Sequence, residues 1–491
     1  MSEGFGKSSG KAKIDLKRLC FTFLGVFLFI VVFYSPPWPD AIDPVGKHFP
    51  LSPEGKGAIA VFLLAGIWWV FEVIPIGVTS LAIGVLQALF FIRPAKEAFN
   101  DFMDPAVLFI FSCLLIGLVF TKTGLTKRLA FKMLSLVGEK TTRIYLGIFI
   151  LITILTHFMA HTAVAATTFP LLLSVNNLYG EEDKPTRFGK GLFMGMAYVC
   201  GAGSIITLLG SARAIVALGF FKEMAGVDTP FYLLTYYMAP VGWLMVFLLW
   251  VFFVIFFKPE KKVIPGLRQR IVQLSADLGP ISKKEIYSLL IIFGAIVFMS
   301  LQVTLPSLQK IDKTAIILIA SVLFFALKIL EIEDLEELPW NIVLLFSGAM
   351  SIGFCLWKTG AAQWMAVHWL AMFQKAHWLV FVLSVALFVM ILTNFIMNVA
   401  AIAISLPVAL VISGYLGVSP HVVMYSSLMT AGMPFILLVG AAPNAIAYAS
   451  KQFTSGEFFK YGCIASIILM GVCALACYLI WPLLGMPVTL K

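Results

Sequence analysis

Two side chains that can carry a positive charge lie inside long apolar stretches of this sequence. His161 stands in the apolar region 143–178, and Arg213 stands in the apolar region 190–221. A charge at bilayer depth costs roughly 2.5–3.5 kcal/mol on insertion scales, so such charges usually mark function. Because arginine stays protonated and can bind a carboxylate bidentately, the two residues predict recognition of a small anion. The alternatives are an arginine that reaches the interface from a helix end and a histidine that only packs in the core.

The composition of the chain indicates a membrane protein. Of its 491 residues, 60% are hydrophobic and only 12% are charged, whereas soluble domains carry about 25% charged residues. The formal net charge is +10, but the basic residues lie mainly in short loops between apolar runs, which favours membrane orientation over nucleic-acid binding. The seven cysteines are scattered and form no C-x-x-C spacing, so neither a disulfide framework nor a metal cluster is expected.

The apolar runs predict a polytopic, all-α protein. A bilayer crossing needs roughly 20 apolar residues. Runs that meet or nearly meet this length are 19–35, 57–75, 76–93, 104–121, 232–257, 286–304, 313–330, 340–357 and 462–485. Four more apolar regions, 143–178, 190–221, 378–415 and 421–450, are interrupted by Gly, Pro, His, Asn and Arg. We therefore predict about 11 transmembrane helices and two re-entrant hairpins.

A basic linker at 258–285 divides the chain into two similar halves, 19–257 and 286–491. Lys122-Thr123-Gly124 reappears as Lys358-Thr359-Gly360, and residues 154–158 match residues 391–395. Residues 209–213 correspond loosely to 439–443. Duplicated halves with interrupted apolar segments at equivalent places are the sequence sign of a secondary transporter with an inverted repeat.

The interrupted segments are where a binding site is expected. Re-entrant hairpins at about 143–178 and 378–415 would place residues 160–162 and 397–399 at their tips. Helices unwound at about 201–213 and 432–444 would be the other two interruptions. Non-helical backbone at membrane depth is tolerated only where it lines a cavity or is buried in protein. Half-helix N-termini then face anionic substrates and unwound carbonyls coordinate cations, so we predict that the four interruptions converge on one site.

Several motifs resemble those of the divalent-anion/sodium symporter (DASS) family. Residues 158–166 and 395–401 are similar to the family's hairpin frames, which carry Ser-Asn-Thr at their tips. Residues 440–446 look like its Pro-Pro-Asn loop, and residues 68–75 are similar to its Trp-Trp-x-x-Glu-x-x-Pro segment. The resemblance spans about residues 55–485. It implies a homodimer that carries dicarboxylates, citrate or sulfate by an elevator motion, with sodium bound by the hairpin asparagines and loop carbonyls.

The binding motifs of this chain depart from the family pattern. Of the six Ser-Asn-Thr positions only Thr162 and Asn398 are retained, and Ser211-Ala212-Arg213 stands where the family has Thr-Pro-Pro. Our hypothesis is that Arg213, together with His161, supplies the positive charge that sodium supplies in the family. Transport would then be independent of sodium, by anion exchange or by proton-coupled symport. A fixed charge that must be neutralised before the carrier crosses would make exchange obligatory.

The sequence therefore predicts a secondary active transporter of small divalent organic anions of the C4-dicarboxylate type, working by sodium-independent exchange and, as the resemblance implies, an elevator mechanism. Substrate-binding residues are expected to be His161, Thr162, Arg213, Asn398, Val399, Pro443 and Asn444. Ion-coupling or loop-backbone residues are expected to be Ala160, Gly203, Ser204, Thr207, Gly210, Ser211, Met397, Gly440 and Ala441.

Other functions remain as alternatives. The same fold could carry sulfate, a sulfonate or citrate, or couple transport to sodium or protons. An anion channel is less expected because nothing resembles a ring of pore charges. An enzyme or an ATP-driven pump is not expected, since the sequence has no H-E-x-x-H, G-x-S-x-G or P-loop pattern. No cofactor is expected, and a requirement for Na⁺ is doubtful on this hypothesis.

The orientation follows from the charges of the tail and the linker. The tail, residues 1–18, is basic, as is the linker, so both are predicted to be cytoplasmic. We expect a multi-pass protein of the inner cell membrane that forms a homodimer and binds no nucleic acid.

Overall fold

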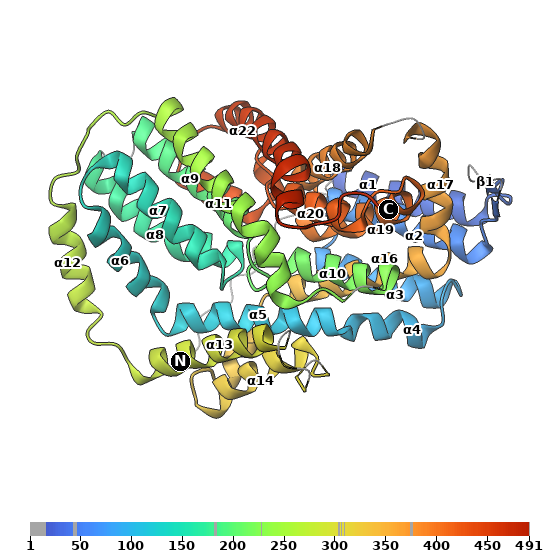
Figure 1. The fold of residues 1–491 in the computed structure, drawn as a ribbon, viewed down its shortest axis with the longest axis horizontal. Helices are drawn as coiled ribbons and strands as arrows, with labels where there is room; N and C mark the ends of the chain where they lie inside the picture. Colours follow the sequence, from blue (N-terminus) through green and yellow to red (C-terminus); the bar gives the residue numbers. More distant parts are fainter. Residues whose placement is uncertain are drawn as a thin grey trace, which may run out of the picture.

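The computed structural model describes residues 16–42, 47–180, 184–226, 228–302, 305, 307–308, 310–373 and 377–490. These residues form a nearly all-helical protein (Figure 1), as the apolar runs predict. Seven helical segments among them are long and apolar enough to cross a membrane: Ala95–Lys122, Phe231–Phe256, Lys283–Leu301, Trp340–Lys358, Trp378–Phe395, Asn398–Tyr415 and Ser455–Leu483. The count of about 11 stays a prediction, because several apolar helices, such as Thr141–Thr156, are shorter than a full crossing.

The first half runs from α1 to α11. Its elements are α1 (Leu16–Tyr34), β1 (Ala41–Ile42), β2 (His48–Phe49), α2 (Pro53–Val70), α3 (Ile76–Leu89), α4 (Ala95–Asn100), η1 (Asp101–Met103), α5 (Pro105–Lys122), α6 (Leu125–Val137), α7 (Thr141–Thr156), α8 (His161–Tyr179), α9 (Arg187–Gly203), α10 (Ala212–Ala225) and α11 (Phe231–Phe256). The two short strands pair antiparallel, with Ala41 opposite Phe49.

The linker and the second half follow. Their elements are α12 (Leu267–Asp277), α13 (Lys283–Leu301), α14 (Lys313–Ala326), α15 (Ile332–Glu336), α16 (Trp340–Lys358), α17 (Ala361–Phe373), α18 (Trp378–Phe395), α19 (Asn398–Tyr415), α20 (Pro420–Ala431), η2 (Leu438–Gly440), α21 (Ala442–Tyr448), α22 (Ser455–Leu475), the π-helical η3 (Ala476–Ile480) and α23 (Trp481–Leu483).

Local sequence signals explain where several helices begin. Ser52 accepts a hydrogen bond from Gly55 N at the start of α2, and Asp104 accepts one from Ala106 N at the start of α5. Each of these helices has proline at its first position, where the missing N–H is not needed. Ser282 and Glu285 form a reciprocal capping box at the start of α13. These caps fix the ends of helices that the apolar runs locate only approximately.

The two halves interlock in a pattern that repeats. Helix α3 of the first half packs against α16 of the second, and α14 of the second half packs against α5 of the first. Helix α7 packs against α9, as α18 packs against α20. Helix α10 packs against α19, as α21 packs against α8. Helices α10 and α21 are the second parts of the two broken helices, and each packs against a hairpin helix of the other half. This packing brings the interrupted segments of the two halves together.

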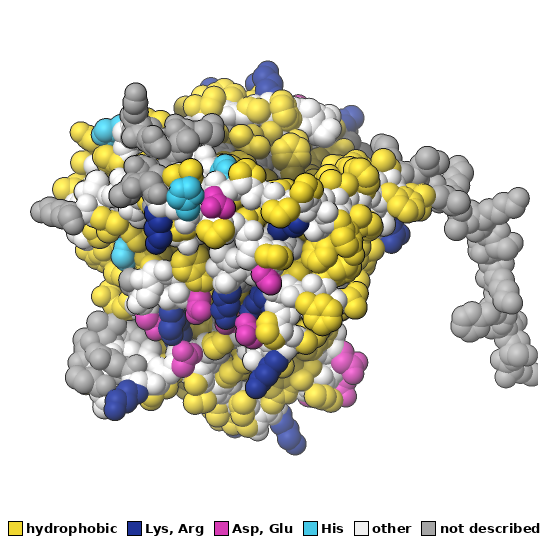
Figure 2. All heavy atoms as spheres, turned by 90° about the vertical axis from the view of Figure 1, so that its right-hand side faces the viewer, with side chains coloured by type: hydrophobic (Ala, Val, Ile, Leu, Met, Phe, Trp, Pro, Cys, Tyr) yellow, Lys and Arg dark blue, Asp and Glu magenta, His cyan; other side chains and the backbone are white. Residues whose placement is uncertain are grey.

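The molecule has two distinct ends. Helices α6 and α12 pack together at one end, here called the linker end, and α17 and β1 pack together at the opposite end, here called the far end (Figure 1). Figure 2, which faces the far end, shows charged side chains across the central part of this face and hydrophobic ones around its edge. Many basic residues lie at the linker end, among them Lys127, Lys132, Lys140, Arg143, Lys258, Lys262, Arg268 and Arg270.

Ion pairs at the linker end join the two halves. Lys122 Nζ lies 2.5 Å from Asp334 Oδ2, so the lysine of the repeated Lys-Thr-Gly motif contacts a short helix of the other half. Arg128 Nε lies 2.7 Å from Glu285 Oε1, and Arg128 Nη1 also donates to Gly279 O at 3.0 Å. Glu285 is buried while Arg128 is partly exposed, so this pair ties α6 to the start of α13.

The buried Glu285 carboxylate should contribute to stability through its hydrogen bonds. Glu285 Oε1 accepts from Arg128 Nε at 2.7 Å, and Glu285 Oε2 accepts from Ser282 N at 2.6 Å. Glu285→Gln removes the negative charge from these bonds, so it is expected to destabilise the protein by about 1.5–3 kcal/mol at pH 7.

Thermal unfolding at pH 7 would check this, with the exposed Glu336→Gln as the matched control. Glu285→Gln should unfold at a lower temperature than the unaltered chain, and Glu336→Gln should not. An unfolding temperature of Glu285→Gln equal to that of the unaltered chain would contradict the assignment.

Candidate functional site

The first broken helix consists of α9 and α10, and the first hairpin consists of α7 and α8. The two contact each other closely at two glycines of the broken helix. A Cβ atom on Gly210 would lie 1.7 Å from Thr156 O, and one on Gly203 would lie 2.3 Å from Thr156 Oγ1. Between them, Thr207 Oγ1 donates to His157 O at 2.7 Å. The segment 204–211 therefore lies directly on the hairpin tip, at a distance that only glycine permits.

The second half repeats this arrangement. A Cβ atom on Gly440 would lie 2.9 Å from Thr393 O. The Thr393 hydroxyl lies 2.8 Å from Ala431 O and 3.0 Å from Asn398 Oδ1. Thr156 and Thr393 occupy equivalent positions of the sequence repeat, so the contact between a loop glycine and a hairpin threonine occurs in both halves. Three oxygen atoms, from Thr393, Asn398 and Ala431, thus meet where the second hairpin touches the second broken helix.

Two asparagines hold the second unwound loop. Asn394 Oδ1 accepts hydrogen bonds from Ile436 N at 2.8 Å and Leu437 N at 3.1 Å. Asn444 Nδ2 donates to Pro434 O at 2.8 Å and to Leu437 O at 3.0 Å. Buried polar groups need such partners in a membrane-spanning region. Asn394 and Asn444 therefore satisfy the loop backbone.

Arg213 takes a different position, between the two halves. Its side chain is only 2% exposed. The guanidinium donates from Nη2 to Ser204 Oγ at 3.0 Å and from Nε to Leu428 O at 3.4 Å. A Cβ on Gly432 would lie 2.3 Å from Arg213 Nη2. Arg213 thus lies where α9 and α20 end, and helix C-termini carry the negative end of the helix dipole, which favours a cation. Its hydrogen-bond partners lie inside the protein.

The two broken helices touch each other beside Arg213. A Cβ on Gly201 would lie 2.8 Å from Gly432 O, so these glycines allow the ends of α9 and α20 to meet. His161 is the first residue of α8, and Arg213 is the second residue of α10. The half-helices α8, α10, α19 and α21 begin at residues 161, 212, 398 and 442, and they pack in two pairs, α10 against α19 and α21 against α8.

The predicted site residues fall into an accessible and a buried group. Ala160, His161, Thr162, Thr207, Met397 and Ala441 are partly exposed. The buried group comprises Gly203, Ser204, Gly210, Ser211, Arg213, Asn398, Val399, Gly440, Pro443 and Asn444. The tip of the first hairpin is thus more open than that of the second. Among the residues with described positions, no cluster of three His, Cys, Asp or Glu side chains could hold a metal ion.

The sequence analysis did not name Thr393, which bridges the second hairpin and the second broken helix. Thr393 could have been found, since it matches Thr156 in the repeat. Gly201 and Gly432 were placed at the starts of the two unwound segments, which were predicted to converge. Their direct contact with each other was not predicted.

A helical membrane protein with two interlocked halves, broken helices and a buried cation where they meet is a secondary transporter by architecture. A model of the family described as the sodium:sulfate symporter transmembrane region matches residues 20–487. The chain belongs to this family, whose members are transporters and not enzymes.

Curated relatives and solved structures agree with this membership. The sodium-dependent dicarboxylate transporter SdcS of Staphylococcus saprophyticus is 25% identical over 461 residues, covering 89% of each chain. SdcS of Staphylococcus aureus strain USA300 is 23% identical over 505 residues, covering 98% of this chain and 94% of the relative. MtrF of Neisseria gonorrhoeae, described as an antimetabolite efflux pump, superposes with a TM-score of 0.57 at 14% identity over 94% of both chains. YdaH of Alcanivorax borkumensis gives 0.57 at 13% identity over 96% and 99%. The two structures show the fold alone.

Proposed function

We propose that this chain carries small divalent organic anions of the C4-dicarboxylate type across the cell membrane by exchange, with Arg213 as a built-in cation. The observation that carries the proposal is the position of the Arg213 guanidinium at the ends of α9 and α20. The names of the SdcS relatives support a dicarboxylate as the substrate, and the same names call the transport sodium-dependent, which favours the second candidate below. Citrate, sulfate and a sulfonate are the other substrates that the same fold could accept.

The charge of Arg213 explains why exchange is proposed. In the described structure its hydrogen bonds use Nε and Nη2, so Nη1 remains for a substrate carboxylate. Together with the N-termini of α8 and α10, it offers positive potential to a dianion. A bound sodium ion can leave after transport, but a guanidinium cannot. A carrier with a fixed charge returns most easily with another anion bound, which gives exchange.

Sodium-coupled symport is the second candidate, and one feature of the second half favours it. Asn398 Oδ1 and Ala431 O both lie within hydrogen-bond distance of the Thr393 hydroxyl, so three oxygen atoms lie close together. Oxygen-only sets with a backbone carbonyl suit a hard cation, and sodium would then be a co-substrate at this position. A single sodium ion in the second half is compatible with Arg213 in the first.

The membrane orientation and assembly are part of the same proposal. The basic residues of the linker end support a cytoplasmic location for that end and for the N-terminus, by the positive-inside rule. A homodimer in the inner membrane is proposed on the family resemblance.

Uptake of labelled succinate into proteoliposomes tests the mode of transport. Vesicles are either empty or preloaded with succinate, with and without sodium and a pH gradient. We expect uptake only into preloaded vesicles and no effect of sodium. Sodium-driven uptake into empty vesicles would replace exchange by the second candidate. An absence of uptake in every condition, with sulfate or citrate transported instead, would contradict the dicarboxylate assignment.

A pair of threonine variants separates the two candidates at the level of residues. Thr393→Val removes the hydroxyl between Asn398 and Ala431. Thr156→Val removes the equivalent hydroxyl of the first half, which among the described residues donates to Thr153 O of its own helix. If sodium binds in the second half, Thr393→Val should raise the sodium concentration for half-maximal uptake about tenfold, and Thr156→Val should not. If transport is exchange without sodium, sodium should not change succinate uptake by either variant.

A further inference from the structure

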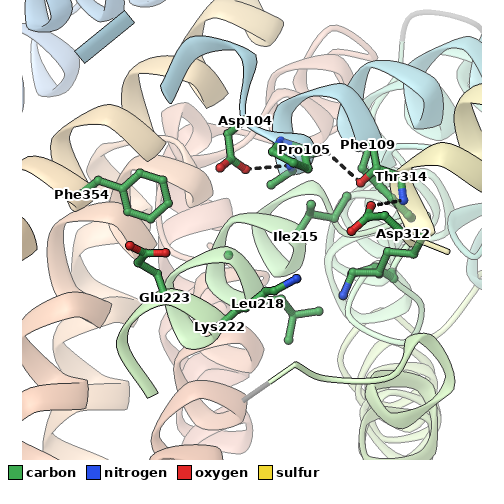
Figure 3. Close-up of a pocket in the computed structure, with 14 residues that line it drawn as sticks. Asp104, Pro105, Phe109, Ile215, Leu218, Lys222, Glu223, Asp312, Thr314 and Phe354 are labelled. Atoms are coloured by element: carbon green, nitrogen blue, oxygen red, sulfur yellow. Dashed lines mark hydrogen bonds between the residues drawn. The ribbon is translucent and has the colours of Figure 1, made fainter. Parts of the chain in front are cut away.

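A cavity of about 210 Å³ lies along α10, from Ile215 to Glu223, and is bounded by α5, α14 and α16 on its other sides (Figure 3). Its apolar wall includes Ile215 and Leu218 of α10, Phe109 of α5 and Phe354 of α16. Figure 3 shows Ile215 and Leu218 on the same helix as the charged Lys222 and Glu223. The cavity therefore combines an apolar interior with charged groups at one end of α10.

A second, more polar recess of about 500 Å³ adjoins this cavity. Both spaces are lined by Lys222, Asp312 and Lys313, so these side chains lie where the two spaces adjoin. The recess also includes Thr229, whose buried hydroxyl makes no hydrogen bond among the residues that the structure describes. A ligand with a polar head and an apolar body would match the two parts.

The polar recess already holds a carboxylate, that of Asp228. Asp228 Oδ2 lies 3.1 Å from Lys222 Nζ, and Asp228 Oδ1 lies 3.3 Å from Lys313 Nζ. Partial burial raises the pKa of Asp228, but Lys313 and Lys222 more than offset this and hold it below its usual value. The side chains of Asp228 and Lys222 are 60% and 56% exposed, so solvent screens the pairing and a carboxylate from a ligand can exchange for it.

The acidic residues of the cavity limit which anion fits. Asp104 and Asp312 accept hydrogen bonds from Ala106 N at 2.8 Å and Thr314 N at 2.7 Å, as helix caps. Glu223 lines the same cavity on the side of Phe354 (Figure 3). A second negative charge inside the cavity would be repelled by these three carboxylates. The space therefore suits one negative charge at the two lysines and an uncharged, apolar remainder.

We propose that this space is a second binding site, for a monocarboxylate with an apolar body, and that its occupation slows transport by holding α10 in place. Helix α10 begins one residue before Arg213 and packs against α19, α5 and α16, so it connects the cavity to the substrate site. A ligand between α10 and α5 would hold together elements that must separate if α10 moves with the substrate. Only the effect on transport rests on the proposed function, whereas binding itself does not.

Calorimetric titration of the purified full chain with 4-phenylbutyrate tests the site directly. We expect saturable binding that is weakened at least tenfold by Lys313→Gln, which removes a head contact, and by Ala106→Phe, which fills the cavity. Asp228→Asn should strengthen binding, because it removes the internal competitor. The matched control is Lys460→Gln, an exposed lysine on α22 near the linker end. Thermal unfolding of each variant checks that it is folded.

Three results would overturn the proposal. The first is a lack of saturable binding to the unaltered chain, and the second is unchanged binding in both Lys313→Gln and Ala106→Phe. The third is displacement of 4-phenylbutyrate by succinate in the Arg213→Ala chain, which would make the space a substrate entrance. Binding that persists in a chain with no dianion uptake would support the second site and count against the proposed function alone.

Discussion

Replacing Arg213 with alanine is expected to lower dianion exchange roughly 100-fold, because truncating one partner of a buried charge pair costs about 2–5 kcal/mol. The loss has two physical sources. The substrate carboxylate loses its charged partner, and Ser204 Oγ and Leu428 O lose the donor that now reaches them. Arg213→Lys should recover part of the rate, since it restores the charge without the planar fork of donors. The measurement is the initial rate of succinate exchange in proteoliposomes.

Sodium provides a second readout that a purely structural role would not change. In Arg213→Ala, the space at the ends of α9 and α20 is free of its cation, so the residual uptake should become stimulated by sodium. Arg143→Ala, at an exposed arginine near the start of α7, is the matched control and should exchange succinate at the unaltered rate. Dianion uptake in Arg213→Ala that equals that of the unaltered chain would contradict a role for Arg213 in the site.

The fold was largely predictable because lipid imposes simple rules on sequence. Uninterrupted apolar runs such as 340–357 correspond closely to single helices, here α16 (Trp340–Lys358), since backbone groups in lipid must be bonded within their own helix. The repeat was visible because both halves keep similar residues where their helices end or are interrupted, including the Lys-Thr-Gly motif at the ends of α5 and α16. What the sequence could not supply was the exchange of partners between halves, such as α10 against α19. That pairing depends on surfaces far apart in the chain.

The site was predictable only in part, for reasons visible in Arg213 and Asn444. An ionisable residue in an apolar segment signals function at once, so Arg213 was found. Ser204 was also named, but its hydrogen bond to Arg213 and the contact of Arg213 with Leu428 O were not predicted. A backbone carbonyl carries no sequence signature. Asn444 as a substrate ligand stays a prediction; in the structure its Nδ2 donates to two carbonyls of its own loop, Pro434 O and Leu437 O. An asparagine that supports a loop and one that binds a ligand look the same in sequence.

Replacing Gly210 with alanine is expected to reduce transport to background. A Cβ at this position would lie 1.7 Å from Thr156 O, a backbone atom that cannot move aside without displacing the hairpin tip. Gly210 is not among the described glycines with positive φ, so the clash, and not the backbone conformation, excludes a side chain. Adding even one methyl group to a fully packed contact typically costs about 1–3 kcal/mol, and a clash with backbone costs more. The same succinate exchange assay measures the effect.

The graded comparison with other glycines is what makes this prediction specific. Gly440→Ala introduces a milder contact, at 2.7 Å from Pro434 Cβ and 2.9 Å from Thr393 O, and should retain more activity than Gly210→Ala. Gly471→Ala, in α22, meets nothing within 4 Å. It should leave transport unchanged and add up to about 1 kcal/mol of helix stability. If Gly210→Ala transports as well as Gly471→Ala, the hairpin tip is free to shift, and the close contact between the broken helix and the hairpin is not needed for the site.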